Sequence, residues 1–378
     1  CMKPRIGGGI LPHTAPTYDG GGGPAWGGCT VSLAWLSWLH YNDRRILEDN
    51  FGMISAWLDF LDSHTENGIL KRWGGDWDYL ADWLWPGATA EGMNNDTPQA
   101  ECFNSCFLAF NLSTAAKIAG VLGKEKERQL WTERAETVRA AVHRKYFNAD
   151  DFSYSDRSMG NLALALLAEV PPAEIRDKVM KRLEDEILIN CRGHIDVGII
   201  GGALMFQLLR SEGRDDLIYS MTSQTDYPGW GNMRAHGATT LWEMWEPDLP
   251  NHSLCHGSFL YPGAWYIDGV AGIRRDDSSP GFRHFIVRSP LIGGDPIKWA
   301  EATYDSPAGV IGSSWRHEDG IFIHEVTVPA NTSATVLIPC PEGSEVSEPS
   351  GHATDAGAEG PYRIFEVPAG HYVFTCEP

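Results

Sequence analysis

The stretch DRRILEDNFGMISAWLDFLDSH, residues 43–64, indicates the fold class because its apolar residues recur with the period of an α-helix. They lie four, three, four and three residues apart, at Leu47, Phe51, Ile54, Leu58 and Leu61. This spacing places the side chains on one stripe of a helix, which must pack against a neighbour. Comparable stretches predict further helices over about 98–122, 125–147, 157–169, 172–189, 197–212, 214–224 and 256–271.

After Gly281 the pattern changes to short runs of β-branched and aromatic residues between Gly, Pro and Ser turns. Runs such as HFIVR (284–288), IFIHEVTVP (321–329) and HYVFTC (371–376) are typical of strands in an antiparallel β-sandwich. The sequence therefore predicts a mainly α-helical domain, residues 1–280, followed by an all-β domain, residues 281–378. The helices follow one another as antiparallel pairs, and long loops lie between certain pairs. This pattern favours a toroid of helical hairpins with the long loops at one end.

The composition of the 378 residues limits the classes of function. Hydrophobic residues make up 43% of the chain, so a large core can be buried and intrinsic disorder is excluded as the main state. The formal charge of −20 disfavours nucleic acid and anionic membrane surfaces as partners. No apolar run approaches the roughly 20 residues of a membrane helix. No Cys or His spacing typical of a metal site occurs, and we expect neither a metal ion nor another cofactor.

Three loops rich in Gly and Trp, residues 1–28, 67–95 and 226–253, interrupt the helical stretches. Long loops in a compact domain are usually functional. A Trp in such a loop either faces a ligand or anchors the loop to the core, and sugar faces stack well on indole rings. Both interpretations stay open for the loop residues Trp26, Trp77, Trp83, Trp85 and Trp230.

The third loop contains the residues best suited to proton transfer, with Glu243 between Trp242 and Trp245. A carboxylate between indoles is partly desolvated, which raises its pKa and suits it to proton transfer. The alternative is a surface Glu that pairs with Arg234 or faces water. The neighbouring Glu246 is expected to point elsewhere and is the weaker candidate. His256, at the start of the last predicted helix, either hydrogen-bonds a ligand hydroxyl or has a structural role.

Acidic residues precede Trp in the second loop, at Asp76 and Asp82. Each can present a carboxylate to a sugar hydroxyl beside an indole, or satisfy local amides in a turn. Inverting glycoside hydrolysis needs a base and an acid about 6.5–9.5 Å apart. Glu243 suits the base, and Asp76, Asp82 and Glu91 are possible acids, none of them compelling.

Five motifs in a fixed order carry a resemblance to a known family. They are YDGGGGPAWG (18–27), GDW (75–77) followed by WPG (85–87), QTDYPGWG (224–231), ATTLWEMW (238–245) and SLCHG (253–257). Together they resemble the catalytic domain of glycoside hydrolase family 78, the α-L-rhamnosidases, from about Leu11 to the C-terminus. The Thr-Thr-x-Trp-Glu-x-Trp string is the most specific of them.

The resemblance implies an (α/α)6 toroid followed by a β-sandwich, and an enzyme that cleaves terminal α-L-rhamnosyl groups with inversion. It implies that Glu243 is the general base, and that Trp26, Trp77 and His256 belong to the rhamnose pocket. The candidate substrate-binding residues are thus Trp26, Asp76, Trp77, Trp83, Trp230, Trp242 and His256. The expected partner is a rhamnosylated glycoside or polysaccharide, with homo-oligomers possible and the compartment open.

One family element is missing from these 378 residues. The family's general acid is a Glu in an Asp-x-Pro-x-Arg-x-Glu segment, and no such segment occurs here. About nine helices, where the toroid has twelve, agree with this absence, and we expect an N-terminally incomplete toroid whose acid lies upstream. The alternatives are a non-catalytic rhamnoside-binding protein, a related (α/α)6 enzyme acting on another sugar, or a polysaccharide lyase.

Overall fold

The computed structural model describes residues 11, 22–74, 78–88, 96–156, 158–247, 252–294, 296–341 and 343–377. The chain divides into two compact units. The helical unit comprises Cys1–Trp35, Arg44–Leu209 and Ser220–Leu260, and the sandwich unit comprises Leu36–Asp43, Arg210–Tyr219 and Tyr261–Pro378. A helical part followed by a β-sandwich is the fold class that the sequence predicts.

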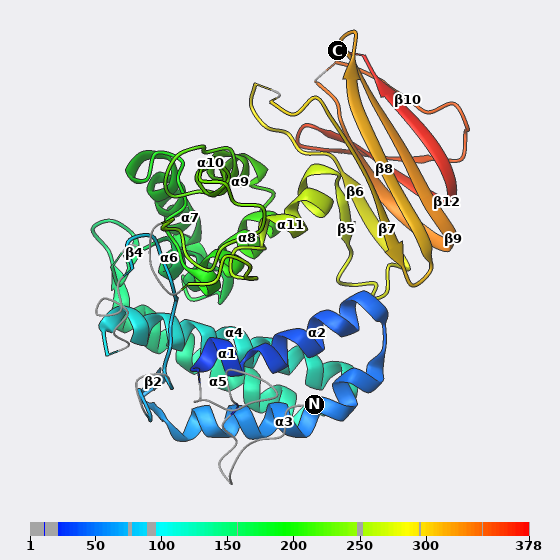
Figure 1. Cartoon of the computed structure of the whole chain (residues 1–378). Helices are drawn as coiled ribbons and strands as arrows, with labels where there is room; N and C mark the ends of the chain where they lie inside the picture. Colours follow the sequence, from blue (N-terminus) through cyan, green and yellow to red (C-terminus); the bar gives the residue numbers. More distant parts are fainter. Residues whose placement is uncertain are drawn as a thin grey trace. The chain divides into compact units, whose positions relative to one another are not determined.

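Except over 256–271, the helices follow the predicted ranges closely (Figure 1). In chain order they are α1 (Pro24–Gly27), α2 (Cys29–Tyr41), α3 (Arg44–Ser63), α4 (Pro98–Leu122), α5 (Glu125–Tyr146), α6 (Met159–Leu167), α7 (Ala173–Asp185), α8 (Ile199–Ser211), α9 (Asp215–Thr222), α10 (Trp230–Ala235) and α11 (Pro262–Trp265), with π-helical turns η1 (Glu186–Asn190) and η2 (Tyr266–Val270). Two short hairpins, β1 (Thr65–Glu66) with β2 (Ile69–Leu70) and β3 (Phe147–Asn148) with β4 (Ser153–Tyr154), follow α3 and α5.

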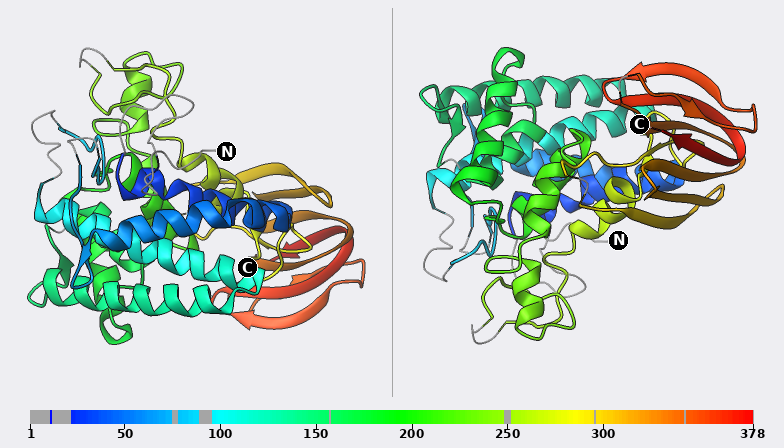
Figure 2. Two further views of the ribbon diagram at one scale, coloured as in Figure 1. Left: turned by 90° about the horizontal axis from the view of Figure 1, so that it is seen from below. Right: turned by 90° about the horizontal axis from the view of Figure 1, so that it is seen from above.

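The apolar stripe of α3 is buried as predicted, from Leu47 to Leu61. The ends of α4 also follow from local chemistry. Thr97 caps its N-terminus, because its Oγ1 accepts a hydrogen bond from Ala100 N at 3.2 Å. Gly123 ends it with a φ of +70°, a conformation that favours glycine. Because α5 begins at Glu125, directly after this turn, α4 and α5 form an antiparallel pair. The two helices lie side by side (Figures 1 and 2).

Helix α4 corrects the prediction that no apolar segment reaches membrane length. Among the described helices it is the one long and apolar enough to cross a membrane. However, 67% of its most apolar window is buried inside the protein. It packs against α5 and α6, so its composition is that of a core helix.

The predicted helix over 256–271 is shorter in the structure, where α11 begins at Pro262. The residues before it are held by pairing with another segment instead, since His256 N donates to Leu241 O at 2.9 Å. Two short helices also lie inside predicted loops, namely α1 around Trp26 and α10 at Trp230.

Eight strands form the β-sandwich, and they are connected through two long strands. The strands are β5 (Ile273–Arg275), β6 (His284–Arg288), β7 (Trp299–Ser306), β8 (Gly309–Glu318), β9 (Ile321–Pro339), β10 (Val346–Ser347), β11 (Thr354–Glu359) and β12 (Tyr362–Cys376). The strands β9 and β12 pair along their length, with a register shift between Pro368 and Gly370. The first half of β9 pairs with β8 and its second half with β6, so β9 contributes to both layers.

The pairing of β6 with β9 is parallel, whereas the sequence predicts antiparallel strands throughout. Alternation of apolar residues along a strand carries no information on the direction of its neighbour. The inward-facing residues of both layers form one core, which includes Phe285, Val287, Trp315, Val336 and Phe374.

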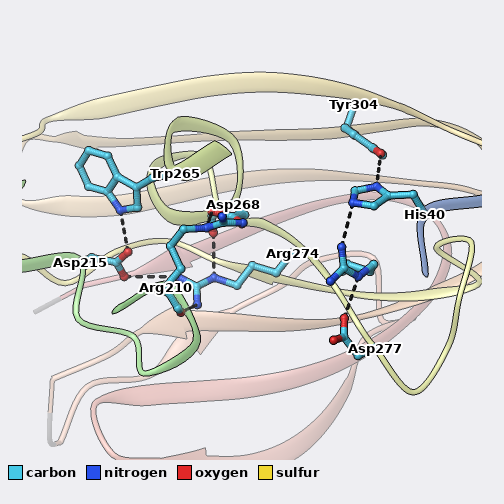
Figure 3. Close-up of polar contacts among 9 residues, drawn as sticks. His40, Arg210, Asp215, Trp265, Asp268, Arg274, Asp277 and Tyr304 are labelled. Atoms are coloured by element: carbon cyan, nitrogen blue, oxygen red, sulfur yellow. Dashed lines mark hydrogen bonds and ion pairs between the residues drawn. The ribbon is translucent and has the colours of Figure 1, made fainter. Parts of the chain in front are cut away.

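A network of Arg and Asp residues lies within the sandwich unit (Figure 3). The carboxylate of Asp215, only 1% exposed, accepts a hydrogen bond from Trp265 Nε1 at 2.8 Å and pairs with Arg274 at 3.3 Å. Arg210 forms an ion pair with Asp268. Arg274 also donates to Asp268 O at 2.8 Å and to Arg210 O at 3.3 Å, so one guanidinium connects η2 to the end of α8.

Candidate active site

The first loop reaches its conformation through glycines that touch other parts of the helical unit. Gly23 has a φ of +87°, and a Cβ there would lie 2.6 Å from the backbone of Leu80. A Cβ on Gly27 would lie 2.6 Å from the ring of Trp57. These glycines therefore let α1 pack closely against the protein itself, and Trp26 is held half-buried between them. Its Nε1 is buried and has no hydrogen-bond partner among the described residues.

The described part of the second loop is fastened to α8 by Asp82. Its carboxylate accepts hydrogen bonds from Gly198 N at 2.8 Å, from Gly201 N at 2.7 Å and from Trp83 N at 3.0 Å. Burial raises the pKa of Asp82 to about 6, although these N–H donors oppose the shift. Trp83 is half-buried, and its carbonyl accepts a hydrogen bond from Ile199 N at 2.7 Å.

The other candidates from the second loop, Asp76, Trp77 and Glu91, lie outside the described residues. Asp82 itself holds the start of α8, because both of its carboxyl oxygens accept backbone N–H groups. These contacts are those of a structural carboxylate at a helix N-terminus rather than of an acid poised over a substrate.

In the third loop, residues 240–243 pair with residues 253–256. Thr240 Oγ1 donates to Leu254 O, and His256 N donates to Leu241 O at 2.9 Å. Glu243 N donates to Ser253 O at 3.0 Å. This pairing brings Glu243 and His256, thirteen positions apart in the sequence, onto adjacent segments.

The side chain of Glu243 is half-buried, and among the described residues it is held at one oxygen. Oε2 accepts a hydrogen bond from Ser253 N at 2.8 Å. No ion pair to Glu243 occurs within the described part of the chain, so the alternative pairing with Arg234 is not seen there. Trp242 and Trp245 on either side of it are buried, and Trp242 meets His252 edge-on with ring centroids 6.4 Å apart.

His256 has a defined ring orientation on an exposed turn. Its Nδ1 accepts a hydrogen bond from Ser258 N at 3.1 Å. An N–H donor to Nδ1 requires the ring proton to reside on Nε2 when the ring is neutral. His256 is therefore arranged to donate a hydrogen bond from Nε2 to a ligand oxygen.

Trp230 belongs to an aromatic cluster of the helical unit. Its Nε1 donates to Phe259 O at 3.1 Å, and its ring meets Trp245 edge-on at 5.2 Å. Trp245 in turn stacks on Phe259 at 3.9 Å and donates from Nε1 to Val197 O at 3.1 Å. These contacts anchor the third loop, and a contact of Trp230 with substrate stays a prediction.

Glu246, ranked second to Glu243 by the sequence, connects the third loop to the second. Its Oε1 accepts hydrogen bonds from Tyr227 Oη and from Gly87 N, each at 2.6 Å. Burial, and then the Glu246 carboxylate, raises the pKa of Tyr227, which keeps this phenol protonated as a donor. No local pattern predicts the contact, since Gly87 lies 159 positions away.

A cavity of about 440 Å³ lies in the same unit, at the N-terminal ends of α4 and α6. Its walls include Asp82 and Trp85 of the second loop, Asn161 of α6, and Glu186 and Asp196 before α8. This volume is within the range of about 300–1,000 Å³ typical of ligand pockets.

Comparison with known proteins identifies the family. Residues 2–270 match the family model described as the bacterial alpha-L-rhamnosidase six-hairpin glycosidase domain. The chain belongs to this family. Residues 272–353 match the bacterial alpha-L-rhamnosidase C-terminal domain. Both matches agree with the resemblance to glycoside hydrolase family 78, and place the chain in an enzyme family.

Relatives in this rhamnosidase family are similar over most of the chain. An alpha-L-rhamnosidase of Streptomyces avermitilis is 28% identical over 97% of this chain, which covers 34% of the relative. One from Alteromonas sp. is 27% identical over 83% of the chain, again covering 34% of the relative. The chain thus spans about a third of the length of these curated relatives.

Solved structures of the family share the fold. The alpha-L-rhamnosidase of Dictyoglumus thermophilum superposes with a TM-score of 0.86 at 26% identity, over 99% of this chain and 42% of that one. The Streptomyces avermitilis enzyme, determined in complex with L-rhamnose, gives a TM-score of 0.85 at 26% identity, over 98% of this chain and 35% of that one.

Proposed function

We propose that the protein carrying this chain hydrolyses terminal α-L-rhamnosyl groups of glycosides or polysaccharides with inversion, and that Glu243 is its general base. The observation that carries the proposal is the Glu243 carboxylate. One oxygen is held by Ser253 N, and the segment lies between two buried indoles. The names of the relatives, alpha-L-rhamnosidases, support the sugar.

The chemistry requires two proton transfers. Water attacks the anomeric carbon from the face opposite the leaving group, and Glu243 accepts its proton as the new C–O bond forms. An acid gives a proton to the leaving oxygen as the old C–O bond breaks, so the products are β-L-rhamnose and an alcohol. A fixed carboxylate is effective because the base must lie within hydrogen-bond reach of the water.

The residues around Glu243 have separate proposed roles. His256 donates from Nε2 to a sugar hydroxyl, and Trp26 offers its ring face. Trp242 and Trp83 limit water access around the sugar, and Asp76 and Trp77 complete the pocket. The general acid is expected from an Asp-x-Pro-x-Arg-x-Glu segment outside these 378 residues.

The test is the hydrolysis of p-nitrophenyl α-L-rhamnoside by the Glu243→Gln variant of the whole protein. We expect kcat to fall by about 10²–10⁴ with KM little changed, because only proton transfer is removed. The control, Glu136→Gln on an exposed position of α5, should leave kcat within about twofold. Proton NMR of the wild-type reaction should show the β-anomer of rhamnose first.

Three outcomes contradict the proposal. Full activity of Glu243→Gln removes this residue from the role of base. The α-anomer as first product contradicts inversion. Rhamnose binding without turnover by the wild-type protein favours the alternative of a non-catalytic rhamnoside-binding protein.

A further inference from the structure

His194 and Asp226 form an ion pair between the segment before α8 and the start of the third loop. His194 Nε2 lies 2.7 Å from Asp226 Oδ1, and its Nδ1 lies 3.1 Å from Cys191 O. A carboxylate and a carbonyl oxygen only accept hydrogen bonds, so both contacts are hydrogen bonds only when both ring nitrogens carry a proton. The arrangement therefore fits the imidazolium form of His194.

The two partners differ in their exposure to solvent. The His194 side chain is 18% exposed, whereas that of Asp226 is 75% exposed. Ion pairs between two exposed side chains stabilise a fold little, but here the cation is the less exposed partner, and its second nitrogen is held by the backbone. The hydrogen bond from His194 is the main cause that lowers the pKa of Asp226, so this carboxylate is charged at neutral pH.

Other titratable groups around the pair have partners or are uncharged. They are Cys191, Arg192 and Asp196 of the same segment as His194, and Glu186 of η1. Burial, and then the charge of Asp196, raises the pKa of the Cys191 thiol to about 12, which keeps it uncharged. Glu186 is paired with Arg182 at 2.7 Å, and Arg192 is exposed. Asp226 is thus the carboxylate that His194 itself binds.

The two segments also pack closely beside the ion pair. Gly193 has a φ of +80°, and a Cβ there would lie 2.5 Å from Ser220 Oγ and 2.8 Å from Gln224 Nε2. A Cβ on Gly231 would lie 2.4 Å from Gln224 O. The segment before α8 and the start of the third loop are therefore fitted to each other, and a change at their ion pair reaches the backbone of the loop.

The ion pair is connected to the segment of the proposed base through the next residue, Tyr227. Tyr227 Oη donates to Glu246 Oε1 at 2.6 Å, and Glu246 lies three residues after Glu243. On the other side of the ion pair, Val197 O accepts from Trp245 Nε1 at 3.1 Å. Both segments that the ion pair joins are therefore hydrogen-bonded to residues shortly after Glu243.

We infer that His194 and Asp226 are positioning residues for the proposed reaction, and that protonated His194 holds the third loop, and with it Glu243, in place. The inference rests on the proposed function for the role of Glu243. Histidine changes its charge between about pH 5 and 8. Neutral His194 has one N–H for two acceptors, so deprotonation removes one hydrogen bond and the attraction between charges. The contribution of the pair is therefore complete at the acidic end of this range and is lost as the pH rises.

The test compares kcat on p-nitrophenyl α-L-rhamnoside for the wild type and His194→Gln of the whole protein, between about pH 5.5 and 8. The ratio of the two rates removes the titration of Glu243 and of the general acid, which both proteins share. We expect the wild type to be about fivefold faster at the acidic end and within about twofold at the alkaline end, with KM little changed. The control His352→Gln, at an exposed position, should match the wild type at every pH.

Asp226→Asn changes the other partner of the ion pair, and its exposed position makes a folding defect unexpected. This variant keeps an acceptor for His194 Nε2 and removes the charge, so kcat should fall about fivefold at the acidic end. The double variant should be no slower than either single variant, because both changes remove the same interaction. A wild-type to His194→Gln ratio that does not vary with pH, or a double variant whose loss is the product of the single losses, overturns the inference.

Amide hydrogen exchange measures the hold on the loop without the reaction. In the wild type, peptides that cover residues 223–231 should lose about fivefold in protection, corrected for the intrinsic exchange rate, from the acidic to the alkaline end. In His194→Gln their protection should not vary with pH. Equal protection of the wild type at both ends overturns the inference. Failure to hydrolyse p-nitrophenyl α-L-rhamnoside at any pH, by contrast, overturns the proposed function, whatever the exchange shows.

Discussion

The contacts of Glu246 with Tyr227 and Gly87 connect the third loop to the second, and the contact with Tyr227 predicts a measurable coupling between two side chains of the third loop. The perturbations are Glu246→Gln, which keeps the shape and removes the charge, and Tyr227→Phe, which removes one donor. Hydrogen bonds to charged groups contribute about 1.5–3 kcal/mol each. Because Tyr227 is 42% exposed and Gly87 is exposed, solvent competes for both contacts, and we take about 1 kcal/mol for each.

Urea unfolding of the two single variants and the double variant provides the assay. We expect each single variant to lose about 1 kcal/mol and the double variant to lose about 1–1.5 kcal/mol, which is less than the sum. Since Glu246 lies three residues after Glu243, Glu246→Gln should also lower kcat on p-nitrophenyl α-L-rhamnoside by roughly tenfold with KM little changed. Strict additivity within about 0.3 kcal/mol, together with an unchanged kcat, would refute the reasoning.

Three further predictions concern stability. Asp215→Ala leaves the partly buried guanidinium of Arg274 without its counter-charge and Trp265 Nε1 without its acceptor, and should cost about 3–5 kcal/mol in urea unfolding; a cost near zero contradicts the ion pair. The folded-state pKa of Asp82, about 6, is raised above its ordinary value, so the group stabilises the fold below about pH 4, and this contribution is lost as pH rises to 6. The free energy of unfolding of the wild type, minus that of Asp82→Asn, should therefore fall by up to about 3 kcal/mol between pH 4 and pH 7. A rise in this difference over the same range contradicts the raised pKa of Asp82. Gly27→Ala places a Cβ 2.6 Å from the ring of Trp57 and should cost about 1–3 kcal/mol, whereas Gly52→Ala, with open space around it, should not destabilise.

The helices could be predicted because their signals are local. The stripe of α3 repeats every three or four residues, and both ends of α4 are set by residues at those ends, Thr97 and Gly123. The prediction of a helix from residue 256 onward was wrong because the deciding contact is not local. His256 is held by a backbone hydrogen bond from a segment fifteen positions earlier, which no helical period reveals.

The candidate site was predictable as a set of motifs but not as a geometry. The sequence places Glu243 between two indoles, and the structure adds that Ser253 holds one of its oxygens. The roles of Asp82 and Glu246 could not be predicted, because their partners lie more than a hundred positions away at Gly198 and Gly87. Polar contacts of this range depend on the packing of whole loops rather than on local pattern.

Chemical rescue of Glu243→Ala by azide tests the central claim most directly. Azide is an anionic nucleophile that needs no base, so it can replace water where the carboxylate has been removed. With p-nitrophenyl α-L-rhamnoside and the whole protein, the account predicts that azide raises p-nitrophenol release by at least about tenfold and that β-L-rhamnosyl azide is the product. No rescue, or α-L-rhamnosyl azide as the product, would contradict Glu243 as the inverting general base.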